Sequence, residues 1–319
     1  MRLIAGDVGG TKTLLRCVEG DGTSSERRYD SNAFTTFDNL LRDFVASVPG
    51  PVDAACFAVA GPVLGTHAEV TNLGWVMHES ALAEAFAIPR VSLINDFYAV
   101  ALGVPLLGDA DLLPLQSAKR DRTAPIGILG AGTGLGQAIV TRDSGIHHVI
   151  PTEAGHADFS PQDEEQARLF VHLHRRFGHV SWERLLSGSG LVNIFTFLGG
   201  DDVQPSAVAE SARAGDSRAA HACEIFVDLY GAEAGNLALR ILARGGIYLA
   251  GGIAAKNVSW FTDGRFVEAF LRKGRFRPLL STIPVDLIMN EEVGLIGAVE
   301  QARRIAGTAL PAGAGSGLH

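Results

Sequence analysis

The N-terminal segment contains residue types that could hold a phosphate group. It reads Gly6-Asp7-Val8-Gly9-Gly10-Thr11-Lys12-Thr13. Glycines at the tip of a hairpin expose successive backbone N–H groups, which form a concave site for an anion. Thr11 and Lys12 add a hydroxyl and a cation, and Asp7 on the preceding strand is placed to hold a hydrated Mg²⁺. An ordinary Gly-Gly turn with an exposed aspartate explains the octet about equally well.

Two further glycine patterns follow apolar, strand-like segments. The first, Gly130-Ala131-Gly132-Thr133-Gly134-Leu135-Gly136, lacks the Gly-Lys-Ser/Thr ending of a Walker loop. The residues after it indicate a strand rather than the helix of a dinucleotide fingerprint, so we predict a second phosphate cradle. The second, Ala250-Gly251-Gly252-Ile253, predicts close approach of the backbone to a flat nucleotide, although a plain strand-to-helix turn explains it equally well.

Three such loops are much more specific together than any one of them. They suit phosphoryl transfer, in which backbone dipoles, a metal ion and a base do most of the work. The candidate base is Asp96 in Ile94-Asn95-Asp96-Phe97, because a carboxylate at a strand end could accept the proton of an attacking hydroxyl. Asn95 offers a neutral donor and acceptor beside it. The alternative is a helix start with Asp96 as N-cap, which the local sequence by itself favours.

The remaining polar set is Glu153-Ala154-Gly155-His156 together with Glu183. The Glu-x-x-His spacing can ligate a metal on a helix, but Gly155 and the preceding Pro151 predict a loop, and no further metal ligands are near in sequence. Carboxylates and an imidazole on loops suit the vicinal hydroxyls of a sugar, which need paired donors and acceptors.

The elements that position these residues alternate between strands and helices. Strands are predicted over 3–8, 13–18, 54–60, 91–94, 126–129, 137–141 and 246–250, and helices over 80–87, 97–102, 162–177, 217–244 and 294–306. The polar stretch 116–123 is interpreted as lying just past a domain boundary. Both halves begin with strand, glycine turn and strand, which suggests two related α/β halves facing each other across a cleft.

Composition limits the classes of protein and partner. The 319 residues are 47% apolar, enough for two domains. Lys and Arg total 27 against 35 Asp and Glu, a net charge of −8 that argues against nucleic acid and anionic membranes as partners. Three scattered cysteines indicate buried reduced thiols. No segment suits a signal peptide or a membrane span, so we expect a soluble, cytoplasmic protein.

Taken together, these segments resemble the bacterial glucokinase family, a branch distinct from the ROK sugar kinases within the actin/hexokinase/heat-shock-chaperone superfamily. The resemblance covers nearly the whole chain and includes Thr71-Asn72 with Trp75 and Glu183-Arg184 before Leu186-Ser187-Gly188. It implies two ribonuclease-H-like α/β domains flanking a central cleft, at 1–107 and 108–294. It also implies a helix at 295–306 packed back on the first domain, and often a homodimer. The small and glycine-rich composition of 307–319 separately predicts a flexible tail.

The resemblance further implies an activity and the residues for it. The activity is transfer of the γ-phosphoryl group of ATP, with Mg²⁺, to the 6-hydroxyl of glucose, the first step of glycolysis. Asp96 matches the catalytic base, and Asn95, Glu153, His156 and Glu183 match the sugar-binding residues. The two phosphate loops correspond to Gly9, Gly10 and Thr11 with Lys12 and to Gly132, Thr133 and Gly134, and the adenosine site corresponds to Gly251 and Gly252.

Three departures and two alternatives accompany this resemblance. Lys12 stands where the family usually has Asn, and Thr152 and Ala154 stand where glycines are common, which could tighten or bias the pocket. The ROK zinc motif is absent, so no structural zinc is expected. The alternatives are a kinase for mannose, fructose or an amino sugar, and a non-catalytic sugar sensor. Retention of Asp7, Asp96 and both glycine loops argues against the sensor.

Overall fold

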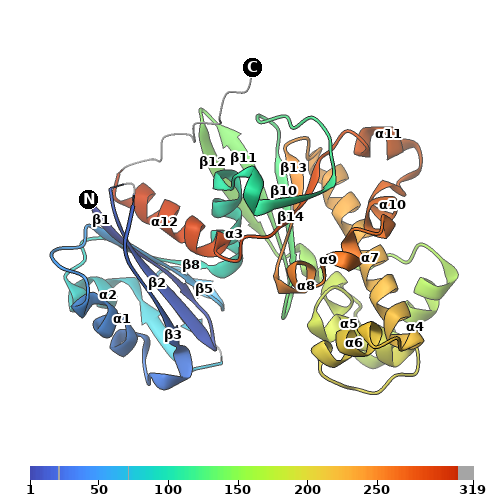
Figure 1. Ribbon diagram of the computed structural model, residues 1–319, viewed down its shortest axis with the longest axis horizontal. Coiled ribbons are helices and arrows are strands. Elements are labelled where there is room, and N and C mark those ends of the chain that lie inside the picture. Colours follow the sequence, from blue (N-terminus) through green and yellow to red (C-terminus); the bar gives the residue numbers. More distant parts are fainter. Residues whose placement is uncertain (21, 71, 308–319) are drawn as a thin grey trace. The chain divides into compact units, whose positions relative to one another are not determined.

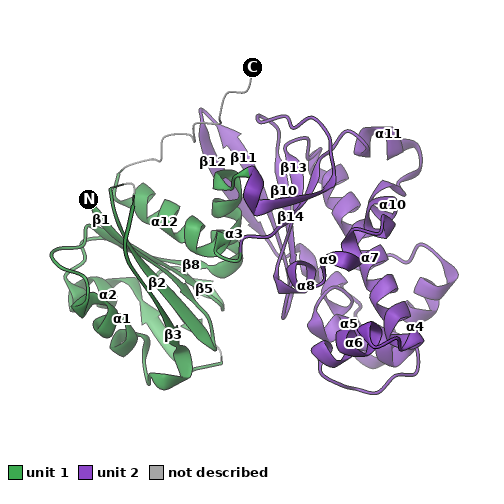
Figure 2. Ribbon diagram, viewed as in Figure 1, with its two compact units in different colours: residues 1–108, 291–319 green, residues 109–290 purple. Residues whose placement is uncertain are grey.

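The computed structural model describes residues 1–20, 22–70 and 72–307, and it divides into two compact units (Figure 2). Unit 1 combines Met1–Gly108 with the segment from Glu291 onward, and unit 2 spans Asp109–Asn290. The predicted α/β class is confirmed. Thr71, part of the resemblance, and residues 308–319 of the predicted tail lie outside the described residues.

Unit 1 contains a sheet with strand order β3-β2-β1-β4-β8 and a small sheet with order β5-β6-β7. Its strands are β1 (Arg2–Val8), β2 (Lys12–Glu19), β3 (Gly22–Asp30), β4 (Ala54–Val59), β5 (Val63–Leu64), β6 (His67–Val70), β7 (Trp75–His78) and β8 (Val91–Asn95). Its α-helices are α1 (Phe37–Ala46), α2 (Glu79–Phe86), α3 (Asp96–Gly103) and α12 (Val293–Ile305).

Helices cover both faces of the larger sheet of unit 1, with α3 and α12 on one face and α1 and α2 on the other (Figure 1). All six residues of β4 are buried, as expected for a strand covered on both sides. Because side chains alternate along a strand, Ile4 and Val8 of β1 join the core cluster around α1, and Asp7 points to the α12 face.

The helices α3 and α12 cross very closely. A Cβ atom at Gly297 would overlap the carbonyl oxygen of Ala99, and one at Gly103 would overlap that of Val293. Glycine at both positions therefore lets the two backbones touch. This packing fixes α3, whose first residue is Asp96, on the sheet.

Unit 2 is built on a sheet with strand order β12-β11-β10-β13-β14-β9. Its strands are β9 (Leu112–Gln116), β10 (Ile126–Ala131), β11 (Leu135–Asp143), β12 (Ile146–Thr152), β13 (Gly246–Ala250) and β14 (Val285–Ile288). Its α-helices are α4 (Glu164–Phe177), α5 (Gly188–Phe197), α6 (Pro205–Arg213), α7 (Ser217–Ile241), α8 (Gly252–Lys256), α9 (Val258–Phe261), α10 (Arg265–Leu271) and α11 (Arg277–Leu280).

The two larger sheets repeat one topology. In unit 1, β1 pairs antiparallel with β2 and parallel with β4, and β4 pairs parallel with β8. In unit 2, β10 pairs antiparallel with β11 and parallel with β13, and β13 pairs parallel with β14. This repeat of strand, turn, strand and parallel strands is the ribonuclease-H-like arrangement that the resemblance implied, although the sequence shows no residue-level repeat.

Two predicted boundaries were wrong. The second glycine turn comprises only Gly132–Gly134, because Gly130 pairs with Gly136 and extends both strands of the hairpin. The helix predicted over 217–244 ends at Ile241, because Leu242 adopts the left-handed conformation with φ 51° and terminates α7. No helix within the described residues is long and apolar enough to cross a membrane.

Candidate active site

The glycine turn of unit 1 connects β1 to β2 and is held by two buried hydroxyl groups. Ser31 Oγ donates to the carbonyl of Gly9 at 2.8 Å and lies 3.0 Å from Thr13 Oγ1, and Ser31 N–H donates to the carbonyl of Thr11 at 3.0 Å. Both hydroxyl side chains are fully buried. The side chains of Thr11 and Lys12 are exposed at the tip, where an anion could reach them.

Asp7 and Asp96 lie at the same edge of the unit 1 sheet. Asp7 is near the carboxyl end of β1, and Asp96 follows the carboxyl end of the parallel strand β8, so both belong to the edge where α/β proteins bind ligands. Burial, and then the negative charge of Asp96, raise the pKa of Asp7 to about 6. Burial also raises the pKa of Asp96, although the hydrogen bond from the Phe97 N–H opposes that shift.

Asn95, not Asp96, caps helix α3. The Asn95 side-chain oxygen accepts hydrogen bonds from the N–H groups of Phe97 at 2.9 Å and Tyr98 at 3.2 Å, and its amide group donates to the carbonyl of Gly61 at 3.3 Å. The local interpretation of Asp96 as N-cap is therefore wrong. Because Asn95 performs the capping, Asp96 occupies the first helical position and its half-buried carboxylate is not needed as a cap.

The glycine turn of unit 2 is held by the segment that runs from Glu183 to Gly188. Gly188 N–H donates to the carbonyl of Gly132 at 2.8 Å, and Leu135 N–H donates to Glu183 Oε2 at 3.0 Å. Within the turn, Gly132 N–H donates to the carbonyl of Gly134 at 2.9 Å. A Cβ atom at Gly132 would meet nothing within 4 Å, so this backbone is open to a ligand.

The structure brings Glu153, His156 and Glu183 together in unit 2. His156 Nε2 lies 4.0 Å from Glu153 Oε2, and His156 Nδ1 lies 4.0 Å from Glu183 Oε1. A short 3₁₀ turn at Ala154–His156 places the imidazole, so the predicted loop is confirmed. Gly155 is required there, because a Cβ atom would overlap the carbonyl oxygen of Leu135.

Thr152, which stands where the family commonly has glycine, has a structural role at the end of β12, just before the 3₁₀ turn. Its hydroxyl donates to the carbonyl of Gln137 at 2.9 Å and accepts from Ala154 N–H at 3.3 Å. Both contacts fix the end of β12 beside β11. The departure at Thr152 thus adds hydrogen bonds to the loop that carries Glu153 and His156.

The third glycine pattern forms a tight turn between β13 and α8. Gly251 has φ +89°, and a Cβ atom there would overlap the carbonyl oxygen of Ala131. The buried hydroxyl of Tyr230 accepts from Ala131 N–H at 3.1 Å and donates to the carbonyl of Leu129 at 3.3 Å, with the carbonyl of Ala250 at 3.5 Å. Burial raises the pKa of this phenol, so it stays neutral and joins the ends of β10 and β13.

No supporting role was assigned from the sequence to several residues that hold the turns. Thr13 and Ser31 hold the turn of unit 1, Tyr230 joins two strand ends, and Gly188 binds the turn of unit 2. Ser31 and Tyr230 are far in sequence from what they support, and no local pattern identifies them. Thr13 and Gly188 belong to segments that the sequence analysis quoted, but their contacts with the turns are seen only in the structure.

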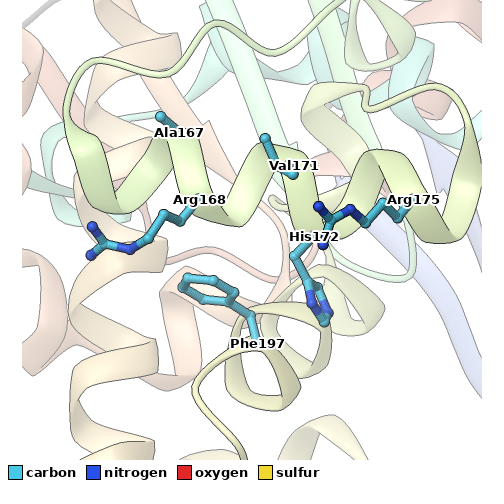
Figure 3. A pocket seen from close by; sticks show the side chains of 6 residues that line it. All are labelled: Ala167, Arg168, Val171, His172, Arg175 and Phe197. Atoms are coloured by element: carbon cyan, nitrogen blue, oxygen red, sulfur yellow. The ribbon is translucent and has the colours of Figure 1, made fainter.

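A shallow hollow of about 500 Å³ lies on unit 2 between α4 and α5, and none of the candidate residues lines it. Figure 3 shows Arg168, His172 and Arg175 of α4 beside Phe197 of α5. The three cationic side chains are exposed on the outer face of α4. Arg175 belongs to the last turn of the helix, where a cation complements its dipole.

The residues near the turn of unit 1 fit a magnesium ion bound partly by a nucleotide. In the part of the chain that the structure describes, no group of three or more His, Cys, Asp or Glu side chains could hold a metal. Mg²⁺ in kinases keeps several waters and binds one or two carboxylates plus phosphate oxygens. Asp7, whose pKa is raised by burial and by a neighbouring negative charge, would gain from such a cation.

Duplicated ribonuclease-H-like sheets with glycine turns after their first strands are the architecture of the actin/hexokinase fold, the fold of the sugar kinases that this structure resembles. A family model described as Glucokinase matches residues 4–305. A glucokinase of Nostoc sp. is 41% identical over 95% of this chain and 99% of its own length.

Solved structures agree with the sequence matches. A glucokinase from an Antarctic psychrotroph superimposes with a TM-score of 0.89 at 27% identity, covering 95% of this chain and 99% of that chain. A ROK family glucokinase from Streptomyces griseus, in complex with glucose and AMPPNP, has a TM-score of 0.63 at 20% identity over 95% of this chain and all of that one, a likeness of fold.

The chain belongs to the glucokinase family. As a member of that family it is an ATP-dependent kinase that phosphorylates glucose. The resemblance inferred from seven short segments is therefore confirmed. The functional roles of the individual site residues remain predictions and are developed below.

Proposed function

We propose that Asp96 is the catalytic base for transfer of the γ-phosphoryl group of ATP to the 6-hydroxyl of glucose. The hydroxyl oxygen forms a bond to the γ-phosphorus while the bond from that phosphorus to the β–γ bridging oxygen breaks. Asp96 accepts the hydroxyl proton, and the products are glucose 6-phosphate and ADP. A half-buried carboxylate with a raised pKa supports this role, because a base is most effective when its pKa approaches the working pH.

We assign the glycine turns to the nucleotide. Gly9, Gly10, Thr11 and Lys12 of unit 1 and Gly132, Thr133 and Gly134 of unit 2 bind phosphate oxygens through backbone N–H groups and side chains. Gly251 and Gly252 lie against adenosine. The exposed Thr11 and Lys12 and the open backbone at Gly132 support this assignment. Glucose hydroxyls bind Asn95, Glu153, His156 and Glu183.

We propose that Asp7 holds Mg²⁺ through water. The ion supplies positive charge that neutralises the transferring phosphoryl group and orients the phosphates. Asp7 then keeps its carboxylate ionised, because a nearby cation lowers the pKa that burial and Asp96 raise.

We also propose a cytoplasmic homodimer with domain limits at 1–107 and 108–294. Three free buried cysteines support a reducing compartment. The dimer follows from the family resemblance. Sedimentation velocity at micromolar protein concentration tests it, and a single monomeric species would contradict it.

One observation carries the proposed chemistry: two half-buried carboxylates, Asp7 and Asp96, share one sheet edge beside the glycine turn of unit 1, and the negative charge of Asp96 adds to burial in raising the pKa of Asp7. The test is purified protein with ATP, Mg²⁺ and a panel of glucose, mannose, fructose and glucosamine. We expect glucose to give the highest kcat/KM. Faster turnover of another hexose would change the substrate, and glucose binding without turnover would favour a sensor.

A further inference from the structure

The carboxylate of Glu183 contacts two functional parts of unit 2. Its Oε1 atom lies 4.0 Å from Nδ1 of His156, in the set assigned to the sugar. Its Oε2 atom accepts a hydrogen bond from the N–H of Leu135 at 3.0 Å. Leu135 is the first residue of β11 and directly follows the Gly132–Gly134 turn. One side chain therefore reaches both the sugar set and the exit of the phosphate loop.

The fit between this carboxylate and the loop is close. A Cβ atom at Gly134 would lie 2.6 Å from Glu183 Oε2, so glycine is needed there for the carboxylate to keep its position. A second hydrogen bond, from Gly188 N–H to the carbonyl of Gly132 at 2.8 Å, holds the entry of the loop. The same short segment thus fixes both ends of the turn.

The backbone around Glu183 is itself well supported. Ser187 Oγ donates to the carbonyl of Glu183 at 2.8 Å and accepts from Gly190 N–H at 3.0 Å, capping α5. Ser187 is fully buried. The backbone that carries the Glu183 side chain is therefore tied to the start of a helix.

Glu153 provides the contrast within the same set. Its side chain is 92% exposed and lies 4.0 Å from His156 Nε2, whereas the side chain of Glu183 is 32% exposed. Both are carboxylates beside one imidazole. Of the two, Glu183 is the one that accepts a hydrogen bond from Leu135, the residue directly after the turn, in the part of the chain that the structure describes.

We infer that Glu183 is the positioning residue of the Gly132–Gly134 loop as well as a ligand of the sugar. The sugar role rests on the function proposed above, and the loop role rests on the hydrogen bond to Leu135. A carboxylate shared between the two would couple the substrates, so that glucose changes the affinity for ATP and ATP changes the affinity for glucose by the same factor.

The experiment measures binding of AMP-PNP, a non-hydrolysable ATP analogue, with Mg²⁺ and without sugar. Wild-type protein, Glu183→Asp and Glu153→Asp are compared by calorimetry. Both variants keep the negative charge, so repulsion of the phosphates is conserved, and each shortens the side chain by one methylene. We expect Glu183→Asp to raise the Kd of AMP-PNP about tenfold, the contribution of a hydrogen bond to a charged group.

The matched variant Glu153→Asp should change that Kd by about twofold or less, because an exposed carboxylate contributes little. Both variants should bind glucose more weakly than the wild type does. If Glu183→Asp binds AMP-PNP as tightly as the wild type does, the loop role is wrong. Turnover of glucose by the wild type tests the proposed function separately. If the wild type phosphorylates glucose and Glu183→Asp still binds AMP-PNP with unchanged Kd, only the loop role is overturned.

A measurement on the wild type decides the case if Glu183→Asp does not fold. Amide hydrogen exchange followed by NMR reports on the Leu135 N–H in the ligand-free protein. We expect protected, slow exchange, because that N–H is bonded to the carboxylate. Exchange at the rate of an unprotected amide would overturn the inference.

Discussion

The two glycine turns each connect a pair of antiparallel strands in the same topology, but different side chains hold them in place. The turn between β1 and β2 is held by the neutral hydroxyls of Thr13 and Ser31, and the turn between β10 and β11 is held by the carboxylate of Glu183. The acids near the first turn, Asp7 and Asp96, are half-buried and have raised pKa values. Of the two acids near the second turn, Glu153 is almost fully exposed, and Glu183 accepts a hydrogen bond from the Leu135 N–H.

This difference indicates a division of labour within one repeated topology. A carboxylate that is removed from water has a shifted pKa, so its protonation responds to nearby charges and it can take a proton from a substrate. An exposed carboxylate is better suited to accept hydrogen bonds from sugar hydroxyl groups than to act as a catalytic base. We therefore expect a change at Asp96 to affect mainly kcat and changes at Glu153 and His156 to affect mainly the KM for glucose.

The largest effect should come from Asp96→Asn. This change should lower kcat by two orders of magnitude or more and leave the affinity for glucose largely intact, because it removes the proton acceptor and keeps the shape. Steady-state kinetics and glucose titration measure the two effects. Glu153→Gln makes the same chemical change at an exposed acid and should alter kcat only a few-fold. A near wild-type kcat in Asp96→Asn would require another base.

Asp7→Asn should stabilise the ligand-free protein at neutral pH. The folded pKa of about 6 exceeds the unfolded value, so the folded state holds a proton between about pH 4 and 6 that the unfolded state releases. The contribution of Asp7 to stability is therefore greatest below about pH 4 and is lost as the pH rises through about 6. At pH 7.5 the variant should gain on the order of 1–3 kcal/mol in free energy of unfolding, and at pH 4 about none.

Urea unfolding at both pH values measures this stabilisation, with Glu153→Gln as the exposed control that should change by about 0.5 kcal/mol or less. The same Asp7→Asn protein should bind Mg²⁺-ATP more weakly. Equal gains at pH 4 and pH 7.5 would show that desolvation of the Asp7 charge is not the cause.

A combined Glu153→Gln and His156→Ala change should raise the KM for glucose about tenfold or more and change kcat much less, because these residues are assigned to binding. Asp158→Asn is a suitable control, since this exposed acid pairs with His179 in the same region. A selective fall in kcat would place Glu153 or His156 in the chemical step and remove the contrast with unit 1.

The smallest effect should come from Ser31→Ala. Loss of its hydrogen bonds to Gly9 and Thr13 should reduce the free energy of unfolding by about 1–2 kcal/mol and raise the KM for ATP a few-fold. The exposed Ser281, which donates to Pro278, gives a control serine whose loss should cost less. If both variants behave alike, the first turn does not depend on its buried hydroxyls.

Six of the seven strands that the sequence predicted lie inside the two larger sheets, where a strand covered on both faces is a continuous apolar run, and the seventh, β8, is an edge strand. The sequence missed β3, β9 and β12 at the edges of the larger sheets, the short strands β5, β6 and β7 of the small sheet, and the buried four-residue strand β14. β3 is polar and mostly exposed, and β9 and β12 each contain a proline, Pro114 or Pro151, which is tolerated at an edge and weakens a strand prediction.

The sequence alone determined the class of the protein and the residues of its candidate site, because glycines and carboxylates at turns after strands are local features. Only the tertiary structure decided which of these groups are buried, which are hydrogen-bonded and what holds each turn. Ser31, Tyr230 and Glu183 act on backbone that lies 20 or more residues away. Such contacts arise from packing of distant segments, which no short sequence pattern records.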